Sequence, residues 1–175
     1  MAINAQVTRQ AGGLPYKWVM AIVLVFGAFM SILDQTVVNI AIPRLQSAFG
    51  ADIHSVQWVI TAYLLTQGAM TPTTPFLANR IGIKRSYILS LVAFTLGSVA
   101  CGLSWSLPVL ILFRIVQGLG GAVLLPLSIT MLLREFPPQE RGVAMATIGV
   151  PTLLAPALGP IVGGYLVTYA DWRVI

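Results

Sequence analysis

Five long apolar stretches dominate this sequence, and each is long enough to cross a lipid bilayer as a helix. They lie near residues 18–42, 56–78, 86–106, 108–133 and 142–170, with short polar connections between them. A helix needs about 20 residues to cross a membrane, because it rises about 1.5 Å per residue through a hydrocarbon core about 30 Å thick. The pattern therefore predicts an all-α, multi-pass transmembrane helical bundle with no room for a soluble domain.

The composition agrees with a bundle whose outer surface contacts lipid. The chain is 57% hydrophobic and 9% charged, and its mean hydropathy is +0.88. A soluble domain usually carries about 25% charged residues, so water could not solvate a surface with so few. We therefore expect the lipid bilayer to be the main partner of this chain.

The basic residues predict how the bundle is oriented. If the tail of residues 1–17 is cytoplasmic, seven basic residues outside the spans face the cytoplasm and two face outward. The inner seven are Arg9, Lys17, Arg80, Lys84, Arg85, Arg134 and Arg141, and the outer two are Arg44 and Arg173. The positive-inside rule then favours a cytoplasmic N-terminus. The net charge of +5 follows from this topology and requires no nucleic-acid partner.

Two charged residues, Asp34 and Arg114, lie well inside predicted spans. A charge near the centre of a membrane helix costs about 2.5–3.5 kcal/mol on insertion scales, so a functional role is the default hypothesis. Asp34 precedes Pro43 by nine residues and Arg114 follows Pro108 by six. At a rise of about 1.5 Å per residue, Asp34 and Arg114 lie roughly 13 and 9 Å below the outer ends of their helices. An ion pair or a shared water-filled cavity is therefore geometrically possible.

Polar side chains near these charges predict a cavity wall. Gln35 and Asn39 lie one helical turn apart and give the first span a polar strip, while Gln117 shares a face with Arg114. A carboxylate in such a cavity could bind and release a proton as the cavity opens to each side in turn. Alternatively, Asp34 and Arg114 form a static bridge that only fixes helix packing. The sequence leaves both roles open.

Small residues predict close helix packing in the last two spans. Gly118 and Gly121 lie on the helix face of Arg114, and Ala155, Gly159 and Gly163 recur every four residues. Such spacing lets the backbones of neighbouring membrane helices approach closely. The last span also contains three prolines, Pro151, Pro156 and Pro160. Together these features favour a helix that flexes or slides against its neighbour.

Four motifs resemble those of the major facilitator superfamily, and within it the fourteen-span drug:proton antiporters of the EmrB/QacA type. They are LDQTVVNIAIP at 33–43, PFLANRIGIKR at 75–85, RIVQGLGGA at 114–122 and ALGPIVGG at 157–164. The second departs from the family pattern, because Pro75 and Asn79 replace the usual glycine and aspartate and Ile83 replaces a basic residue. The resemblance covers almost all of residues 18–175, which it implies to be part of the N-terminal transmembrane domain of a longer chain with twelve or fourteen spans.

The resemblance also implies roles for individual residues. Asp34 and Arg114 would couple transport to protons. The loop between the second and third spans would bias the inward and outward states through Asn79, Arg80, Gly82, Lys84 and Arg85. The antiporter motif in the fifth span would gate or seal the cavity through Gly159, Pro160, Gly163 and Gly164.

The expected function is proton-coupled export of several drugs through the cytoplasmic membrane of a bacterium. The expected partners are protons, a small amphipathic or cationic substrate and the rest of the same chain, with no cofactor, metal or catalytic residue. A facilitator of a defined metabolite is the alternative, and a membrane-embedded receptor or enzyme is a more distant one. Lone His54 is interpreted as an ordinary loop residue more readily than as a proton or metal site, and Trp58 and Tyr63 as membrane-interface or lipid-facing aromatics.

Overall fold

The chain folds into a bundle of helices, and the computed structural model describes residues 16–170 and 172–174. The long helices are α1 (Tyr16–Phe49), α2 (Ile53–Met70), α4 (Ile83–Gly102), α5 (Leu107–Glu135) and α6 (Arg141–Tyr169). Short elements connect or follow them, namely η1 (Thr71–Thr73), α3 (Thr74–Ile81), η2 (Pro138–Glu140) and η3 (Trp172–Val174). Within these described residues there is no strand. The predicted all-α class is therefore confirmed, while Arg9 and most of the predicted tail lie outside the described residues.

Four segments are long and apolar enough to cross a membrane by length and composition. They are α1, α4, α5 and Pro138–Tyr169, which contains η2 and α6. The predicted second span, 56–78, has a different form, because it is divided among α2, η1 and α3. Polar residues along α2, including Gln57 and Gln67, make it less apolar than the other four.

The break after α3 has a backbone cause. Gly82 ends α3 and precedes α4, and its φ of 89° lies in the left-handed region that side chains with a Cβ rarely adopt. A second local adjustment occurs in α5, where Pro126 lacks the N–H that would bond the carbonyl of Ala122. The hydroxyl of Thr71 in η1 donates to the carbonyl of Gln67 at 2.7 Å and lies 3.4 Å from the carbonyl of Ala122, so it gives the freed carbonyl a weaker, shared contact.

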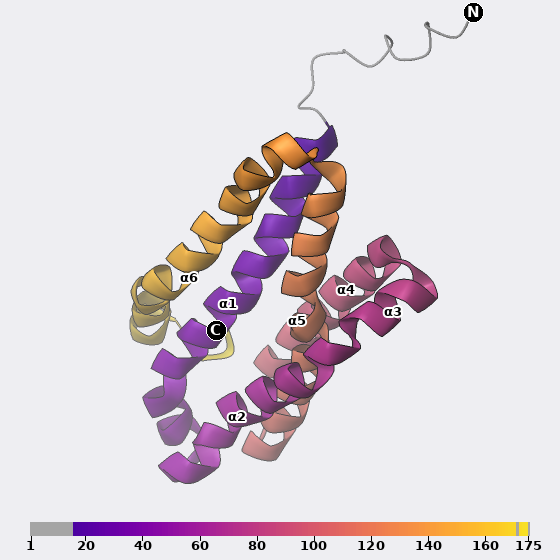
Figure 1. The fold of residues 1–175 in the computed structure, drawn as a ribbon. Helices are drawn as coiled ribbons and strands as arrows, with labels where there is room; N and C mark the ends of the chain where they lie inside the picture. The colour runs from indigo at the N-terminus through magenta and orange to yellow at the C-terminus, as the bar shows by residue number, and fades with distance from the viewer. Residues whose placement is uncertain (1–15, 171, 175) are drawn as a thin grey trace, which may run out of the picture.

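Small residues set the spacing of the bundle. Helix α1 lies between α6 and α5, and α5 also packs against α2 and α4 (Figure 1). The interface of α4 with α5 is so close that a Cβ atom at Gly97 would lie 2.7 Å from the Cα of Gln117. Real Cβ atoms essentially never approach another heavy atom within 3.0 Å. Glycine at this position is therefore what allows the two helices to touch.

The beginning of α1 is attached to the connection between α5 and α6. Lys17 donates to the carboxylate of Glu140 at 2.6 Å and lies 5.4 Å from the ring centre of Phe136. Trp18 packs edge-on against the same ring, with centroids 5.4 Å apart. These contacts hold the start of α1 against the connection between α5 and α6.

Candidate functional site

The structure brings the two intramembrane charges together at the centre of the bundle. Nη1 of Arg114 donates to Oδ2 of Asp34 at 2.7 Å. The side chains of arginine and aspartate are only 6% and 10% exposed, respectively. Because little water reaches the pair, each charge depends on the other and on nearby dipoles for stabilisation.

Gln117 completes this cluster by bonding to both charged groups. Its Nε2 donates to Oδ1 of Asp34 at 3.1 Å, and its Oε1 accepts from Nη1 of Arg114 at 2.9 Å. Gln117 is fully buried, and its Oε1 also accepts from the thiol of Cys101 at 3.7 Å. The three residues Asp34, Arg114 and Gln117 are called the ion-pair cluster below. The amide pairs with a negative and a positive group at once and so bridges the two charges.

The motif in α5 explains how the cluster is assembled. Arg114 and Gln117 lie three residues apart and therefore share one helix face, which meets α1 at Asp34. One turn further along, Gly118 and Gly121 admit α2: a Cβ at Gly121 would lie 2.5 Å from the hydroxyl of Tyr63. The same face of α5 thus contacts two other helices.

Tyr63 corrects one prediction from the sequence. It is predicted to anchor at the membrane interface or contact lipid, but in the structure it is 1% exposed. Its hydroxyl lies 3.2 Å from Oγ of Ser31, and Cζ of Arg114 lies 5.7 Å from its ring centre. The signal for this placement is in α5, where Gly118 and Gly121 leave room for a bulky neighbour. Trp58, in contrast, is 54% exposed.

The polar strip on α1 lies on a different face from Asp34. Gln35 donates to Oε1 of Gln67 on α2 at 3.4 Å, and also to the carbonyl of Ser31. The exposed side chain of Asn39 donates to the carbonyl of Gln35 at 2.9 Å. The hydrogen bonds of both side chains are thus directed away from Asp34. A cavity wall that includes Gln35 and Asn39 stays a prediction.

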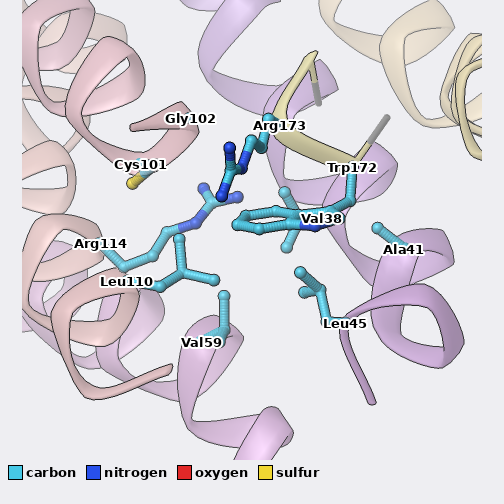
Figure 2. A pocket seen from close by; sticks show the side chains of 10 residues that line it. All are labelled: Val38, Ala41, Leu45, Val59, Cys101, Gly102, Leu110, Arg114, Trp172 and Arg173. Carbon is cyan, nitrogen blue, oxygen red and sulfur yellow. The ribbon is translucent and has the colours of Figure 1, made fainter. Parts of the chain in front are cut away.

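A small cavity adjoins Arg114 on the side facing the ends of α1 and α4 (Figure 2). Its walls are mostly apolar, and Trp172 and Arg173 of η3 reach into it. The cavity is lined by Val38, Ala41, Leu45, Val59, Cys101, Gly102, Leu110, Arg114, Trp172 and Arg173. Trp172 also packs against Phe49, with ring centroids 4.9 Å apart. The segment after α6 therefore covers this end of the ion-pair cluster.

The small residues of α6 contact α1 directly. Ala155, Gly159 and Gly163 are buried. A Cβ at Gly159 would lie 2.7 Å from Oγ1 of Thr36, and one at Gly163 would lie 3.3 Å from the Cα of Val37. The other two predicted motif residues face away from this contact: Pro160 is exposed, and a Cβ at Gly164 would have no atom within 4 Å.

The predicted conformational loop lies at the exposed end of α3 and the start of α4. Its predicted residues lie between positions 79 and 85, and most of their side chains face outward from the bundle. Arg80 lies over the ring of Phe76, with its Cζ 5.9 Å from the ring centre. Gly82 supplies the left-handed turn described above.

His54 lies in the first turn of α2, where its side chain is exposed, and not in a loop as the sequence predicts. Its backbone N–H donates to Asp52, which caps the first turn of α2. Among the residues that the structure describes, no three His, Cys, Asp or Glu side chains lie close enough together to hold a metal ion.

Comparison with known proteins gives a consistent family assignment. Residues 24–175 match the model of the Major Facilitator Superfamily. The multidrug export protein EmrB of Escherichia coli (strain K12) is 38% identical over 154 residues, which are 88% of this chain and 30% of that protein. The multidrug resistance protein B homolog of Mycobacterium tuberculosis (strain ATCC 25618 / H37Rv) is 40% identical over 153 residues, covering 87% of this chain and 28% of that protein. This chain thus spans less than a third of either relative's length.

A solved structure has the same fold. The crystal structure of a bacterial homologue of the human lysosomal transporter Spinster, inward-facing and unoccupied, matches 89% of this chain and 33% of that one. The TM-score is 0.77 at 22% sequence identity. At this identity the match concerns the arrangement of the helices.

Proposed function

The chain belongs to the major facilitator superfamily, a family of multi-pass membrane transporters, and we propose that the complete protein is a proton-coupled multidrug exporter. In this proposal the chain holds the proton-coupling site. The observation that carries it is the ion-pair cluster, a buried carboxylate bonded to a buried arginine between two membrane helices. The multidrug proteins among the relatives support the choice of substrate class.

The proposed coupling step is protonation of Asp34. A proton that reaches Oδ2 neutralises the carboxylate, and the attraction between Asp34 on α1 and Arg114 on α5 falls sharply. Arg114 keeps its charge, because a guanidinium is not deprotonated in proteins. The two helices are then held less tightly, and the change in charge favours release of a cationic substrate. Loss of the proton to the other side restores the ion pair.

The other predicted residues have supporting roles in this proposal. Gly159 and Gly163 let α6 move against α1 while excluding water, and Pro160 and Gly164 add flexibility on the far face of α6. The loop with Asn79, Arg80, Gly82, Lys84 and Arg85 biases the inward and outward states. The rest of the same chain supplies the opposing helices, since facilitator halves work as pairs around a central site. We propose no enzymatic activity, because the relatives are transporters.

The proposed location is the cytoplasmic membrane, with the N-terminus inside. The basic loop residues and Lys17 support this orientation through the positive-inside rule. In this orientation η3 and the cavity in Figure 2 face the outside, which is the side from which protons enter.

The test is substrate-induced proton release from the purified full-length protein in weakly buffered detergent solution. Addition of the lipophilic cation tetraphenylphosphonium should release protons from the wild type in part of a pH series, because the cation displaces the proton proposed to bind Asp34. Asp34→Asn should release none, while Asp52→Asn, which alters an exposed capping carboxylate, should behave as the wild type. Equal proton release from Asp34→Asn would leave the pair as a static bridge. Binding of one metabolite but of no unrelated cation would favour the alternative, a facilitator of a defined compound.

A further inference from the structure

Arg114 has a second stabilising neighbour in addition to Asp34, namely the aromatic ring of Tyr63. Cζ of the guanidinium lies 5.7 Å from the ring centre, and the residues are 5% and 1% exposed. The face of an aromatic ring carries partial negative charge and attracts cations within about 6 Å. This attraction is stronger where water is excluded, as it is here.

The ring matters most when Asp34 carries a proton. Arg114 then remains charged and buried but has lost its anionic partner. Its Nε has no hydrogen-bond partner among the described residues, and its Nη1 keeps the contact with Oε1 of Gln117. A neutral carboxyl still accepts hydrogen bonds but has no negative charge, so the amide oxygen of Gln117 and the ring of Tyr63 take a larger share in stabilising the cation.

Packing fixes the ring in this place. The hydroxyl of Tyr63 is bonded to Ser31, which lies one turn before Asp34 on α1. On the other side, α5 approaches closely: a Cβ at Gly118 would lie 3.0 Å from the carbonyl oxygen of Tyr63, and one at Gly121 would meet its hydroxyl. A ring held from both sides can keep its position while the charge of Asp34 changes.

We propose that Tyr63 is a positioning residue that holds the Arg114 guanidinium in place while Asp34 is protonated, and so sets the pH range of transport. The inference rests on the proposed function, because it assumes that Asp34 takes up the coupled proton. It adds a residue of α2 to a site otherwise formed by α1 and α5.

Charged and titratable groups surround the pair on several helices. Tyr63 lies on α2, Cys101 on α4, and Arg173 of η3 lines the same cavity as Arg114. From α6, the apolar Val162 and Leu166 line a cavity with Asp34. Except for Tyr63 itself, these groups are the same in all the variants below, so a difference among variants reports on the ring.

The test measures the pH dependence of dye efflux by the full-length protein in proteoliposomes. Tyr63→Leu removes the ring, so protonation of Asp34 leaves Arg114 less stabilised and requires a higher proton concentration. The midpoint should move to lower pH by about one unit, a tenfold change in proton concentration, which is the size expected of a desolvated cation–π contact. Tyr63→Phe keeps the ring and should stay close to the wild-type midpoint. Trp58→Leu, an exposed aromatic on the same helix, is the matched control and should also leave it unchanged.

A second measurement does not depend on transport. Thermal unfolding in detergent is compared for Tyr63→Leu in the wild type and in Asp34→Asn, which imitates the neutral carboxylate. The loss of Tm should be larger in Asp34→Asn, because the ring then has a larger share in stabilising Arg114. Equal losses in both backgrounds, or an unchanged efflux midpoint in Tyr63→Leu, would reduce Tyr63 to a packing residue.

Two further outcomes would separate a failure of this inference from a failure of the proposed function. A midpoint that shifts equally in Tyr63→Phe would assign the effect to the hydroxyl and overturn the role of the ring. Absence of pH-dependent efflux in every variant would refute the proposed function, while the unfolding comparison would still decide the role of Tyr63.

Discussion

The contact of α6 with α1 predicts a large difference between two alanine substitutions on the same helix. In Gly159→Ala the new Cβ would lie 2.7 Å from Oγ1 of Thr36 and closer still to the Cβ of that residue. In Gly149→Ala the new methyl group has no atom within 4 Å. Because real Cβ atoms essentially never come within 3.0 Å of another heavy atom, α1 and α6 must separate in the first variant only.

The magnitude follows from the comparison. Both variants gain the same helix propensity, about 1 kcal/mol for alanine over glycine in soluble helices, so this term cancels in the difference. Overpacking of a tight contact costs about 1–3 kcal/mol. Gly159→Ala should therefore be less stable than Gly149→Ala by about 1–3 kcal/mol.

The assay is the free energy of unfolding of the full-length protein in detergent, measured by denaturant titration with the two variants side by side. Dye efflux in proteoliposomes should fall in Gly159→Ala and remain near the wild-type rate in Gly149→Ala. Equal stability and equal efflux of the two variants would refute the idea that α6 needs glycine to approach α1.

Three further predictions concern the ends of the helices. Trp172→Ala should uncover the cavity beside Arg114 and raise the rate at which a small thiol reagent labels Cys101, while Trp172→Phe should keep the wild-type rate. Equal labelling rates in both variants would show that η3 does not cover the cavity. Gly82→Ala must adopt a φ of 89° with a Cβ atom, which costs about 1–2 kcal/mol of folding free energy; denaturant titration that finds no loss would contradict the left-handed turn. The side-chain and backbone hydrogen bonds of Ser55 lower the pKa of Asp52 below its usual 3.8. Its ionised form thus stabilises α2 above pH 3.8, and this contribution is lost as the pH falls through the lowered pKa. Asp52→Ala should raise hydrogen exchange in the first turn of α2 at neutral pH, and exchange equal to the wild type would show that the cap contributes nothing.

The sequence was sufficient to predict the helical class and to show that an ion pair of Asp34 with Arg114 was geometrically possible. Both follow from the constant rise of a helix, which converts residue counts into depth in a membrane. The face shared by Arg114 and Gln117 follows from the same periodicity. The resemblance to the major facilitator superfamily is confirmed by the match over residues 24–175.

Other features depended on tertiary packing that no local pattern contains. The burial of Tyr63 is set by two glycines on another helix, so its own neighbours in the sequence gave no sign of it. The direction of the Gln35 side chain, in contrast, could have been predicted from helix geometry alone. Adjacent residues on a helix point about 100° apart, so Gln35 faces α2 while Asp34 faces α5.

The division of the predicted second span has a similar cause. Residues 56–78 can be interpreted as one helix from their apolar content, but the structure divides them at the 3₁₀ turn of η1, which is a change in the backbone. The hydroxyl of Thr71 in η1 also lies 3.4 Å from the carbonyl oxygen of Ala122 on α5, so the break is in contact with a helix distant in the sequence. A pattern of hydrophobicity does not contain such a contact.

The central claim is that Asp34 carries the coupled proton, and pH-gradient-driven dye efflux by the full-length protein tests it most directly. In proteoliposomes with an imposed pH gradient, the wild type should move dye against its concentration gradient. Asp34→Asn, checked for folding by thermal unfolding, should bind dye and exchange it downhill but show no response to the gradient. Dye accumulation by Asp34→Asn at the wild-type level and with the wild-type pH dependence would contradict the account.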